Sequence, residues 1–484
     1  MRPLTVFLAL FVVLTACTAP ARDVPATPLP PATSIPAKPT SAPAGTAVPE
    51  SPARNATLET SLLATEWKSS SEGILLFPLD PASGMALPGY PPISLGQVST
   101  HAFSPDRHTL AVVSIPNDYA YDGSLLLIDL PAWKVRRFEL EFRGWVSNMV
   151  FSPDGTRLAI AHGQSKHQIT MVNVGKGVIT AQREMGVGYV SRLKFTVNGE
   201  GLMLYGPVIK NRFTANEMNG GTPQVLLLDA ADLSPRWSAA LEGVRDGIYP
   251  KDENVTSANT HEPGQSFYLN PGLAFVPDQD TLYVVHADSE QMTIVDFSSQ
   301  KVRTLDIQDQ LTWFERLLSL TAGVAYAKIA DGTSKQAAIS PDGQFVYVVG
   351  ANNATYQDQQ GNWQMEHTPL GLEIIQTRDG SRLRHIETDA IELSISPDGR
   401  FLYLRKWGPG APSTEILDTS NQQFVARKTR LSAIPALLMN GEFLLASTYS
   451  TSENSHHMSV LEPDGSNVLA EWKGSEYVWF LTTP

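Results

Sequence analysis

The sequence predicts an all-β fold in which one four-stranded antiparallel unit repeats along the chain. Three observations lead to this prediction. A Ser-Pro-Asp-Gly turn recurs between short apolar segments, and eight apolar segments end in an aliphatic residue followed by an acid or amide. The 484-residue chain is 42% hydrophobic, which supplies a core and excludes wholesale disorder. Repeats at a regular period indicate a fold built from one recurring supersecondary unit.

The recurring turn is a hairpin signal. Proline presets φ at the first corner of a β-turn, aspartate suits the second corner, and glycine accepts the positive φ that follows. We therefore expect two antiparallel strands to flank each copy. The copies are Phe103–Asp106, Phe151–Gly155, Phe275–Asp278, Ile339–Gly343 and Ile395–Gly399, with degenerate copies at Phe195–Gly199 and Leu438–Gly441.

The second repeated signal is an aliphatic residue followed by an acid or amide at the end of one predicted strand in each unit. Its recurring acids invite a catalytic interpretation, but they occupy the same place in unit after unit. We expect their carboxylates to cap turns through hydrogen bonds. The eight copies are Leu79-Asp80, Ile128-Asp129, Val172-Asn173, Leu228-Asp229, Val295-Asp296, Ile375-Gln376, Leu417-Asp418 and Leu461-Glu462.

Together the two signals give four strands per period, and these residues resemble the WD-repeat-like and YVTN-type bacterial β-propellers. The segment Leu282–Asp296 is especially similar to the YVTN pattern. The resemblance covers residues 61–482 and implies a β-propeller of four-stranded antiparallel blades. We predict eight blades, closed by pairing of the N-terminal strand with the C-terminal strand. Seven blades, the commoner number in the family, is the alternative.

The N-terminus predicts export and lipid attachment. A single positive charge precedes the apolar run Leu4–Leu14, which is too short to span a bilayer and is typical of a signal peptide. The run ends in Leu14-Thr15-Ala16-Cys17, which resembles the lipobox of bacterial lipoproteins. The resemblance implies cleavage after Ala16 and lipid attachment at Cys17. An ordinary secretory signal with an incidental cysteine is the alternative.

Three segments follow from these signals: a signal peptide over 1–16, a tether over 17–57 and a β-propeller over 58–484. Ten of the chain's 35 prolines lie within residues 18–57, mixed with alanine and threonine. Such a segment cannot bury a core and favours extended conformations. We expect a disordered, semi-rigid spacer between the lipidated cysteine and the propeller. Cys17 is the only cysteine, so an internal disulfide is excluded.

The first of three insertions, near 206–271, carries polar and aromatic residues. Two interpretations stay open: a ligand or cation site built on hard oxygen atoms, or a solvated polar loop. The residues concerned are Asp246, Tyr249, Lys251, Asp252, Glu253, His261, Glu262 and Tyr268.

The other two insertions lie near 306–335 and 351–369. The first places Leu311, Phe314, Leu317 and Leu318 at helical spacing, which predicts a short amphipathic helix that packs on its own blade or acts as a partner-binding lid. The second is expected to be a long loop. Its aromatic and polar residues Tyr356, Trp363 and His367 suit a glycan or protein partner.

No catalytic signature is present in the sequence. It holds no Gly-x-Ser-x-Gly, His-Glu-x-x-His, Gly-x-Gly-x-x-Gly, P-loop or haem-attachment motif. We therefore assign no catalytic, cofactor-binding or metal-binding residue and expect no cofactor, although a channel-centred site would leave little linear trace. The net charge of −13 opposes binding to nucleic acid.

These observations favour a monomeric, extracytoplasmic scaffold anchored to a membrane of the bacterial cell envelope through lipid on Cys17. Its propeller would recruit a protein or an envelope polymer such as a glycan through its loop faces. A propeller enzyme with its site in the central channel, similar to lactonase-like or quinoprotein-like propellers, is the alternative. A weaker third interpretation is an assembly lipoprotein resembling propellers of outer-membrane insertion machinery.

Overall fold

The computed structural model describes most of the region predicted to fold. All structural statements concern residues 61–69, 73–81, 83–115, 123–142, 145–163, 167–185, 190–207, 222–250, 266–309, 332–357, 363–396, 398–406, 413–428, 432–434, 444–450, 455–474 and 478–480. Cys17, the tether and the segment predicted to be helical lie outside these residues.

The described part of the chain is all-β, with strands β1 to β35 and no helix. It accordingly offers no helical segment of the length and hydropathy needed to cross a bilayer. One seven-stranded sheet runs β35-β1-β2-β3-β4-β5-β6. Its strands are β1 Leu62–Ser69, β2 Gly73–Leu79, β3 Ile93–Phe103, β4 Thr109–Ile115, β5 Gly123–Asp129, β6 Lys134–Phe142 and β35 Val478–Phe480.

Five four-stranded antiparallel sheets follow the predicted pattern. The first two contain β7 Trp145–Phe151, β8 Arg157–Gly163, β9 His167–Asn173, β10 Val178–Glu184, then β11 Arg192–Phe195, β12 Gly201–Pro207, β13 Pro223–Asp229, β14 Pro235–Ala240. The third contains β17 Gly272–Phe275, β18 Thr281–Val285, β19 Gln291–Asp296, β20 Lys301–Asp306. The last two contain β27 Ala390–Ile395, β28 Phe401–Lys406, β29 Ser413–Asp418, β30 Gln423–Lys428, then β31 Ser432–Ile434, β32 Leu444–Ser450, β33 Ser455–Leu461, β34 Val468–Gly474.

The remaining sheet has eight strands along the path β15-β16-β22-β23-β25-β26-β21, with β24 paired to β23. Four of them, β22, β23, β25 and β26, form a four-stranded antiparallel unit like the five sheets above. The bounds are β15 Gly247–Pro250, β16 Ser266–Asn270, β21 Gln308–Asp309, β22 Gly332–Ile339, β23 Phe345–Gln357, β24 Trp363–Pro369, β25 Leu372–Gln376 and β26 Ser381–Ile386.

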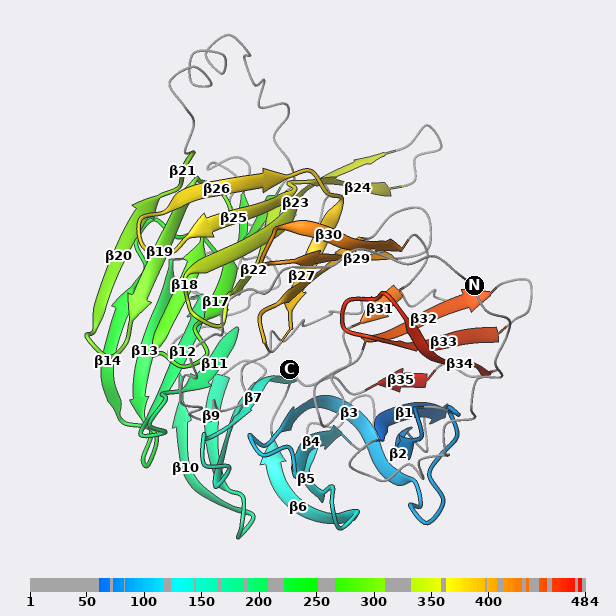
Figure 1. Ribbon diagram of the computed structural model, residues 1–484. Coiled ribbons are helices and arrows are strands. Elements are labelled where there is room, and N and C mark those ends of the chain that lie inside the picture. Colours follow the sequence, from blue (N-terminus) through cyan, green and yellow to red (C-terminus); the bar gives the residue numbers. More distant parts are fainter. Residues whose placement is uncertain are drawn as a thin grey trace, which may run out of the picture.

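The sheets follow one another around the molecule in chain order, so that the two ends of the described chain meet (Figure 1). The C-terminal strand β35 pairs antiparallel with β1 through three residue pairs: Ala64 with Phe480, Thr65 with Trp479 and Glu66 with Val478. Strand β3 belongs to two units, since its first part pairs with β2 and its second part with β4.

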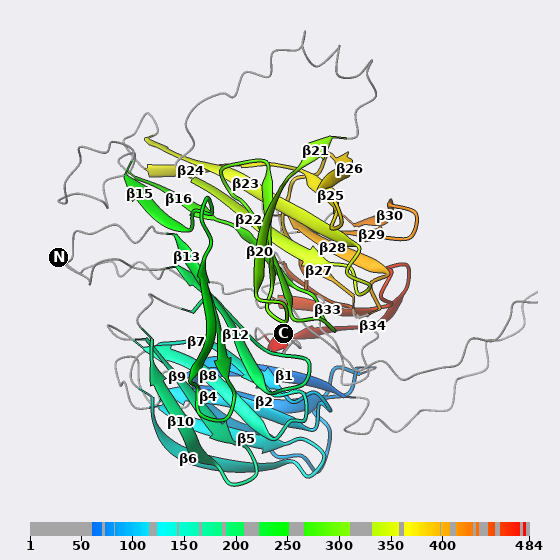
Figure 2. The ribbon, with the colours of Figure 1, turned by 90° about the vertical axis from the view of Figure 1, so that its left-hand side faces the viewer.

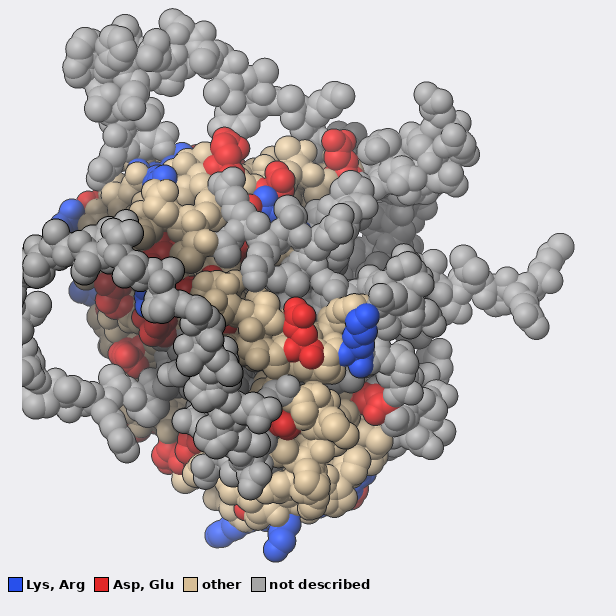
Figure 3. All heavy atoms as spheres, turned by 45° about the vertical axis from the view of Figure 1, so that its right-hand side comes forward, with Lys and Arg blue, Asp and Glu red and all other residues tan. Residues whose placement is uncertain are grey.

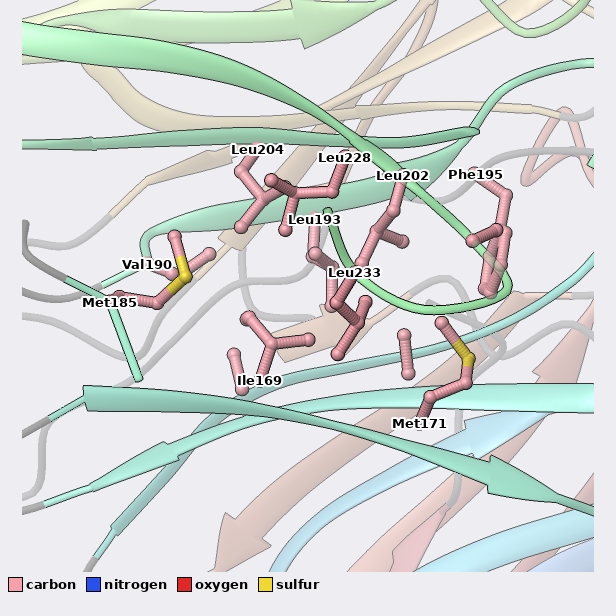
Figure 4. Packing of buried hydrophobic residues seen from close by; sticks show 13 residues of the cluster. Ile169, Met171, Met185, Val190, Leu193, Phe195, Leu202, Leu204, Leu228 and Leu233 are labelled. Atoms are coloured by element: carbon pink, nitrogen blue, oxygen red, sulfur yellow. The ribbon is translucent and has the colours of Figure 1, made fainter. Parts of the chain in front are cut away.

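Apolar clusters fill the spaces between successive sheets. In chain order they join β1–β3 to β4–β5, β3–β5 to β7–β9, β8–β9 to β11–β13, β12–β13 to β17–β19, β17–β19 to β22–β25, β22–β25 to β27–β29, and β28–β29 to β32–β33. A further cluster joins the last sheet to the first, with Val460 packed with Leu62, Ala64 and Leu79. Figure 4 shows one such interface, in which Ile169 and Met171 of β9 face Leu193 and Leu202.

The Ser-Pro-Asp turns form hairpins as expected, and a buried hydroxyl organises them. Ser152 Oγ donates a hydrogen bond to Asp154 Oδ1 at 2.5 Å and accepts one from the Arg157 amide at 2.9 Å. Gly155 has a φ of 70°, a conformation that glycine adopts without strain. The same Ser–Asp bond recurs at Ser104, Ser340 and Ser396.

The prediction that the recurring acids cap turns is also confirmed. Asp129 Oδ1 accepts a hydrogen bond from the Ala132 amide at 2.9 Å, and Asp296 Oδ1 accepts one from the Ser299 amide at 3.0 Å. Equivalent bonds are made by Asp229 and Asp418. These carboxylates are therefore structural.

Antiparallel topology separates the two ends of each unit. The Ser-Pro-Asp turns connect first to second strands and so lie at one end, the turn end. The longest connections leave the strands at the opposite end, the loop-bearing end. They run from β12 to β13, from β14 to β17 and from β20 to β22. Figure 2 shows β15, β16 and β24 grouped at one end of the molecule.

The insertion near 351–369 differs from the expected long loop. Strand β23 continues to Gln357, and β24 pairs back along it from Trp363 to Pro369. The predicted loop is therefore largely a hairpin, because extending a strand that is already paired satisfies its backbone groups without a new core.

We expect Ser152→Ala to lower the free energy of unfolding by about 1–3 kcal/mol, because the partly buried Arg157 amide loses its hydroxyl partner. Ser152→Thr is the matched control, since Thr196 fills the equivalent place and its hydroxyl bonds Asn198 at 2.8 Å. Urea denaturation measures both. Equal stability of the alanine variant and the wild type would contradict a structural role for the hydroxyl.

Candidate functional site

At the loop-bearing end, five strands of the eight-stranded sheet pair side by side, and this part of the sheet is here called the loop-end sheet. Its order is β15-β16-β22-β23-β24, and β16 pairs parallel with β22. Gly332 permits this contact, because an added Cβ there would lie 2.3 Å from the Tyr268 carbonyl oxygen. The loop-end sheet therefore joins the first insertion to the unit that contains β22.

An aromatic pair lies on β15 and β16. The rings of Tyr249 and Phe267 stack with centroids 5.7 Å apart and an interplanar angle of 23°. The Arg245 guanidinium lies 4.2 Å from the Tyr249 centroid and 5.2 Å from that of Phe267, and it pairs with Asp288 at 3.7 Å. Cation–π contacts of this kind stabilise an ordered surface.

Asp246 is a buried carboxylic acid next to this pair. It is only 4% exposed and accepts a hydrogen bond from the Tyr205 hydroxyl at 2.9 Å. Burial raises the pKa of Asp246 to about 6, although the Tyr205 bond and the Arg192 charge oppose the shift. The group therefore titrates near neutral pH.

Two buried histidines occupy the same place in different sheets. His286 Nε2 lies 2.8 Å from Thr293 Oγ1, and His162 Nε2 lies 2.8 Å from Thr170 Oγ1. Burial lowers the pKa of His286, which favours its neutral form. Because the pair recurs between second and third strands, we assign it to strand packing. The sequence signal was available: each histidine stands ten residues after the start of a turn motif, at Ser152 and Val276.

A charged cluster lies where the β17–β20 sheet meets the unit that contains β22. Arg382 pairs with Glu373 at 3.1 Å and also with Glu290. The Arg382 and Glu373 side chains are each only 15% exposed. Burial raises the pKa of Glu373, while the charges of Arg382 and Lys335 oppose that shift.

Lys335 is the most enclosed member of the cluster, with 8% of its surface exposed. Its Nζ is not one of the fully buried, unpartnered side-chain atoms of the described chain. Burial lowers the pKa of Lys335, and the carboxylates of Glu373, Glu290 and Asp288 oppose the shift. No sequence motif pointed to this lysine, because its neighbours come from distant segments.

The structure brings together two residues from the first insertion and separates a third. Asp246 and Tyr249 lie in the site, whereas Tyr268 points to the opposite side of β16 from Phe267, because successive strand residues alternate. Lys251, Asp252, Glu253, His261 and Glu262 lie outside the described residues, as do Leu311, Phe314, Leu317 and Leu318.

In the third insertion, the backbones of Tyr356 and Trp363 belong to the β23–β24 hairpin. His367 is exposed, and its Nδ1 is hydrogen bonded to the Asn353 side chain.

Among the described residues, no three His, Cys, Asp or Glu side chains come together in an arrangement that could hold a metal ion. On the face shown in Figure 3, described Lys and Arg side chains are few and dispersed among acidic and uncharged ones. That distribution agrees with the net charge of −13.

Solved structures similar to this chain are propeller-type proteins. The dihydro-heme d1 dehydrogenase NirN, in complex with DHE, matches with a TM-score of 0.51 and 11% identity over 89% of this chain and 77% of the other. The hydrazine synthase of Kuenenia stuttgartiensis matches with a TM-score of 0.42 and 17% identity over 77% of this chain and 97% of the other. A eukaryotic initiation factor gives a TM-score of 0.45 and 12% identity over 88% and 99% of the two chains.

The chain therefore has a fold of the β-propeller type, and at these identities the likeness concerns the fold alone. Neither a family model nor a curated protein matches the sequence.

The shifted pKa of Asp246 predicts a pH-dependent stability. Between the unfolded value of 3.8 and about 6, the folded state holds a proton that the unfolded state has lost, so stability falls as pH rises. We expect a loss of about 3 kcal/mol from this group across that range.

Asp246→Asn should remove this decline, because asparagine keeps an acceptor for Tyr205 without titrating. Urea denaturation at a series of pH values tests this. Parallel stability curves for the variant and the wild type would refute the assignment.

Proposed function

We propose that this chain is an extracytoplasmic, lipid-anchored scaffold whose eight-bladed propeller recruits a protein or an envelope polymer through its loop-bearing end. The observation that carries the proposal is the division between the two ends of the units. Near-identical hydrogen-bonded turns occupy one end, and the long connections, the aromatic pair and the charged cluster occupy the other. Variable segments on a rigid frame are the usual place for binding.

The way the strands group supports eight blades. Five four-stranded sheets supply one blade each, the unit β22-β23-β25-β26 supplies a sixth, and the seven-stranded sheet divides at β3 into two more. The cluster between the last and first sheets and the pairing of β35 with β1 support closure of the ring.

The loop-bearing end offers accessible groups for a partner. Arg245 is 44% exposed and Glu290 53% exposed, and both are held by ion pairs with partly buried side chains. Ordered charged and aromatic groups favour specific recognition, because little side-chain entropy is lost on binding.

The anchor and its spacer complete the proposal. Cys17 in its lipobox would carry the lipid, and the proline-rich tether over 17–57 would hold the propeller away from the membrane. A scaffold at that position can reach partners within the envelope.

An enzyme is the second candidate, and the buried Asp246 favours it. A carboxylic acid with a pKa near 6 resembles the general acids of many active sites. Turnover of a substrate by the purified chain, abolished by Asp246→Asn, would establish that alternative.

Site-specific photo-crosslinking in the native host tests the scaffold role. Crosslinking residues placed at the loop-bearing end, at Glu290 or Glu366, should capture a common partner. The exposed turn-end positions Lys176 and Arg378 are the matched controls and should not. Capture from the turn end alone, or equally from both ends, would contradict the proposed binding face.

Cys17→Ser should prevent incorporation of labelled palmitate and release the chain from the membrane fraction, because the only thiol is lost. Thr18→Ser is the control and should remain labelled and membrane-bound. A Cys17→Ser chain that stays in the membrane fraction would disprove lipid anchoring through this residue.

A further inference from the structure

Strand β24, at the loop-bearing end, has one edge to which no described strand is paired. Its other edge pairs with β23 over its whole length, from Ala351 with Pro369 to Gln357 with Trp363. Since β23 is its only partner among the described strands, β24 ends the sheet on that side (Figure 1). A strand at the end of a sheet presents a row of backbone N–H and C=O groups to which a further strand can bond.

The other sheets also end in the last strand of a unit, and those strands are protected against such pairing. Each carries at least one lysine or arginine, and all but β20 pair with their neighbour through a register shift. Basic side chains and bulges are common means of keeping a further strand off an edge. The basic residues are Lys134, Arg136 and Arg137 of β6, Arg183 of β10, Arg236 of β14, Lys301 and Arg303 of β20, Arg427 and Lys428 of β30, and Lys473 of β34.

Strand β24 lacks this protection. Its sequence, Trp-Gln-Met-Glu-His-Thr-Pro, contains no lysine or arginine, and its only proline is the final residue, Pro369. It pairs with β23 without a register shift, so no bulge turns the edge away from an incoming strand. Its only acidic residue, Glu366, is exposed near the middle of the strand. The contrast with the other sheets favours an edge that is kept available for pairing.

Charge distinguishes between the possible occupants of this edge. A second copy of the chain would bring one net charge of −13 against another, and their repulsion opposes self-pairing. An extended segment that contains lysine or arginine is favoured instead, because one of these residues can lie directly opposite Glu366. Such a cross-strand pair adds charge complementarity to backbone hydrogen bonds, which depend little on sequence.

We propose that β24 binds an extended, basic segment of a partner protein by strand addition, so that the loop-end sheet gains one strand beyond β24. The inference rests on the proposed recruitment of a protein at the loop-bearing end and names how that protein is held. The backbone groups of β24 supply the affinity, and Glu366 selects basic side chains.

A synthetic heptapeptide, Thr-Lys-Val-Lys-Val-Lys-Thr, tests strand addition to the full-length chain. Fluorescence anisotropy of the labelled peptide should show saturable binding. The same peptide N-methylated at every lysine and valine should bind about tenfold more weakly or worse, because methylation removes backbone donors and leaves the side chains unchanged. Absence of peptide binding at millimolar concentration, or equal binding of the methylated form, would overturn the proposal.

Glu366→Lys tests whether the peptide binds at β24. It places a basic side chain on this edge, as on the other sheets, and should weaken peptide binding about fivefold or more. Its melting temperature should match that of the wild type, because Glu366 is exposed. Glu139→Lys is the matched control: Glu139 is an exposed acid on the protected strand β6, and its replacement should leave binding unchanged. Equal effects of the two substitutions would mean that the peptide responds to overall charge, and would overturn the proposal.

Strand addition and recruitment can fail separately. Capture of a partner by the crosslinker at Glu366, together with equal binding of the methylated and unmethylated peptides, would remove strand addition and leave recruitment standing. Peptide binding as expected, with no partner captured at Glu290 or Glu366, would contradict recruitment in the host and support the binding edge.

Discussion

Apolar burial on both faces of each sheet is the constraint on which this architecture depends. Strand β8 shows it directly: Leu158 and Ile160 enter the cluster shared with the preceding sheet, whereas Ala159 and Ala161 enter the cluster shared with the next. A sheet with two apolar faces needs a neighbour on each side. A linear stack would leave two faces exposed, and the cluster of Val460 with Leu62, Ala64 and Leu79 supports our proposal that the last sheet packs against the first.

Packing of the sheets face against face also restricts where a binding site can form. The strands and their Ser-Pro-Asp turns stabilise the fold, and the hydroxyl and carboxylate groups of the turns already form local hydrogen bonds. The opposite end is under less constraint and carries the loop-end sheet, Asp246 and Lys335. A buried acid such as Asp246 is costly to keep, which is why we associate that end with binding rather than with stability alone.

The turns and strand ends could be predicted from sequence because each depends on neighbouring residues, as Ser152, Asp154 and Gly155 show. The site could not, because Lys335, Glu373 and Asp288 come together only when two sheets pack. The hairpin over 351–369 was missed for a related reason: its stability comes from continuing β23, and its polar sequence lacks the alternation of a half-buried strand. Cys17 and the tether remain sequence-based predictions.

We propose that pairing of β35 with β1 closes the ring, and a disulfide across that pair tests the closure. Val478 lies opposite Glu66 in the register, and opposed Cα atoms in antiparallel strands are close enough for a disulfide. In a Cys17→Ser background, we expect Glu66→Cys with Val478→Cys to oxidise spontaneously. Glu66→Cys with Phe480→Cys, two residues out of register, should not. Failure of the first pair to form, or equal formation of both, would contradict the closed ring.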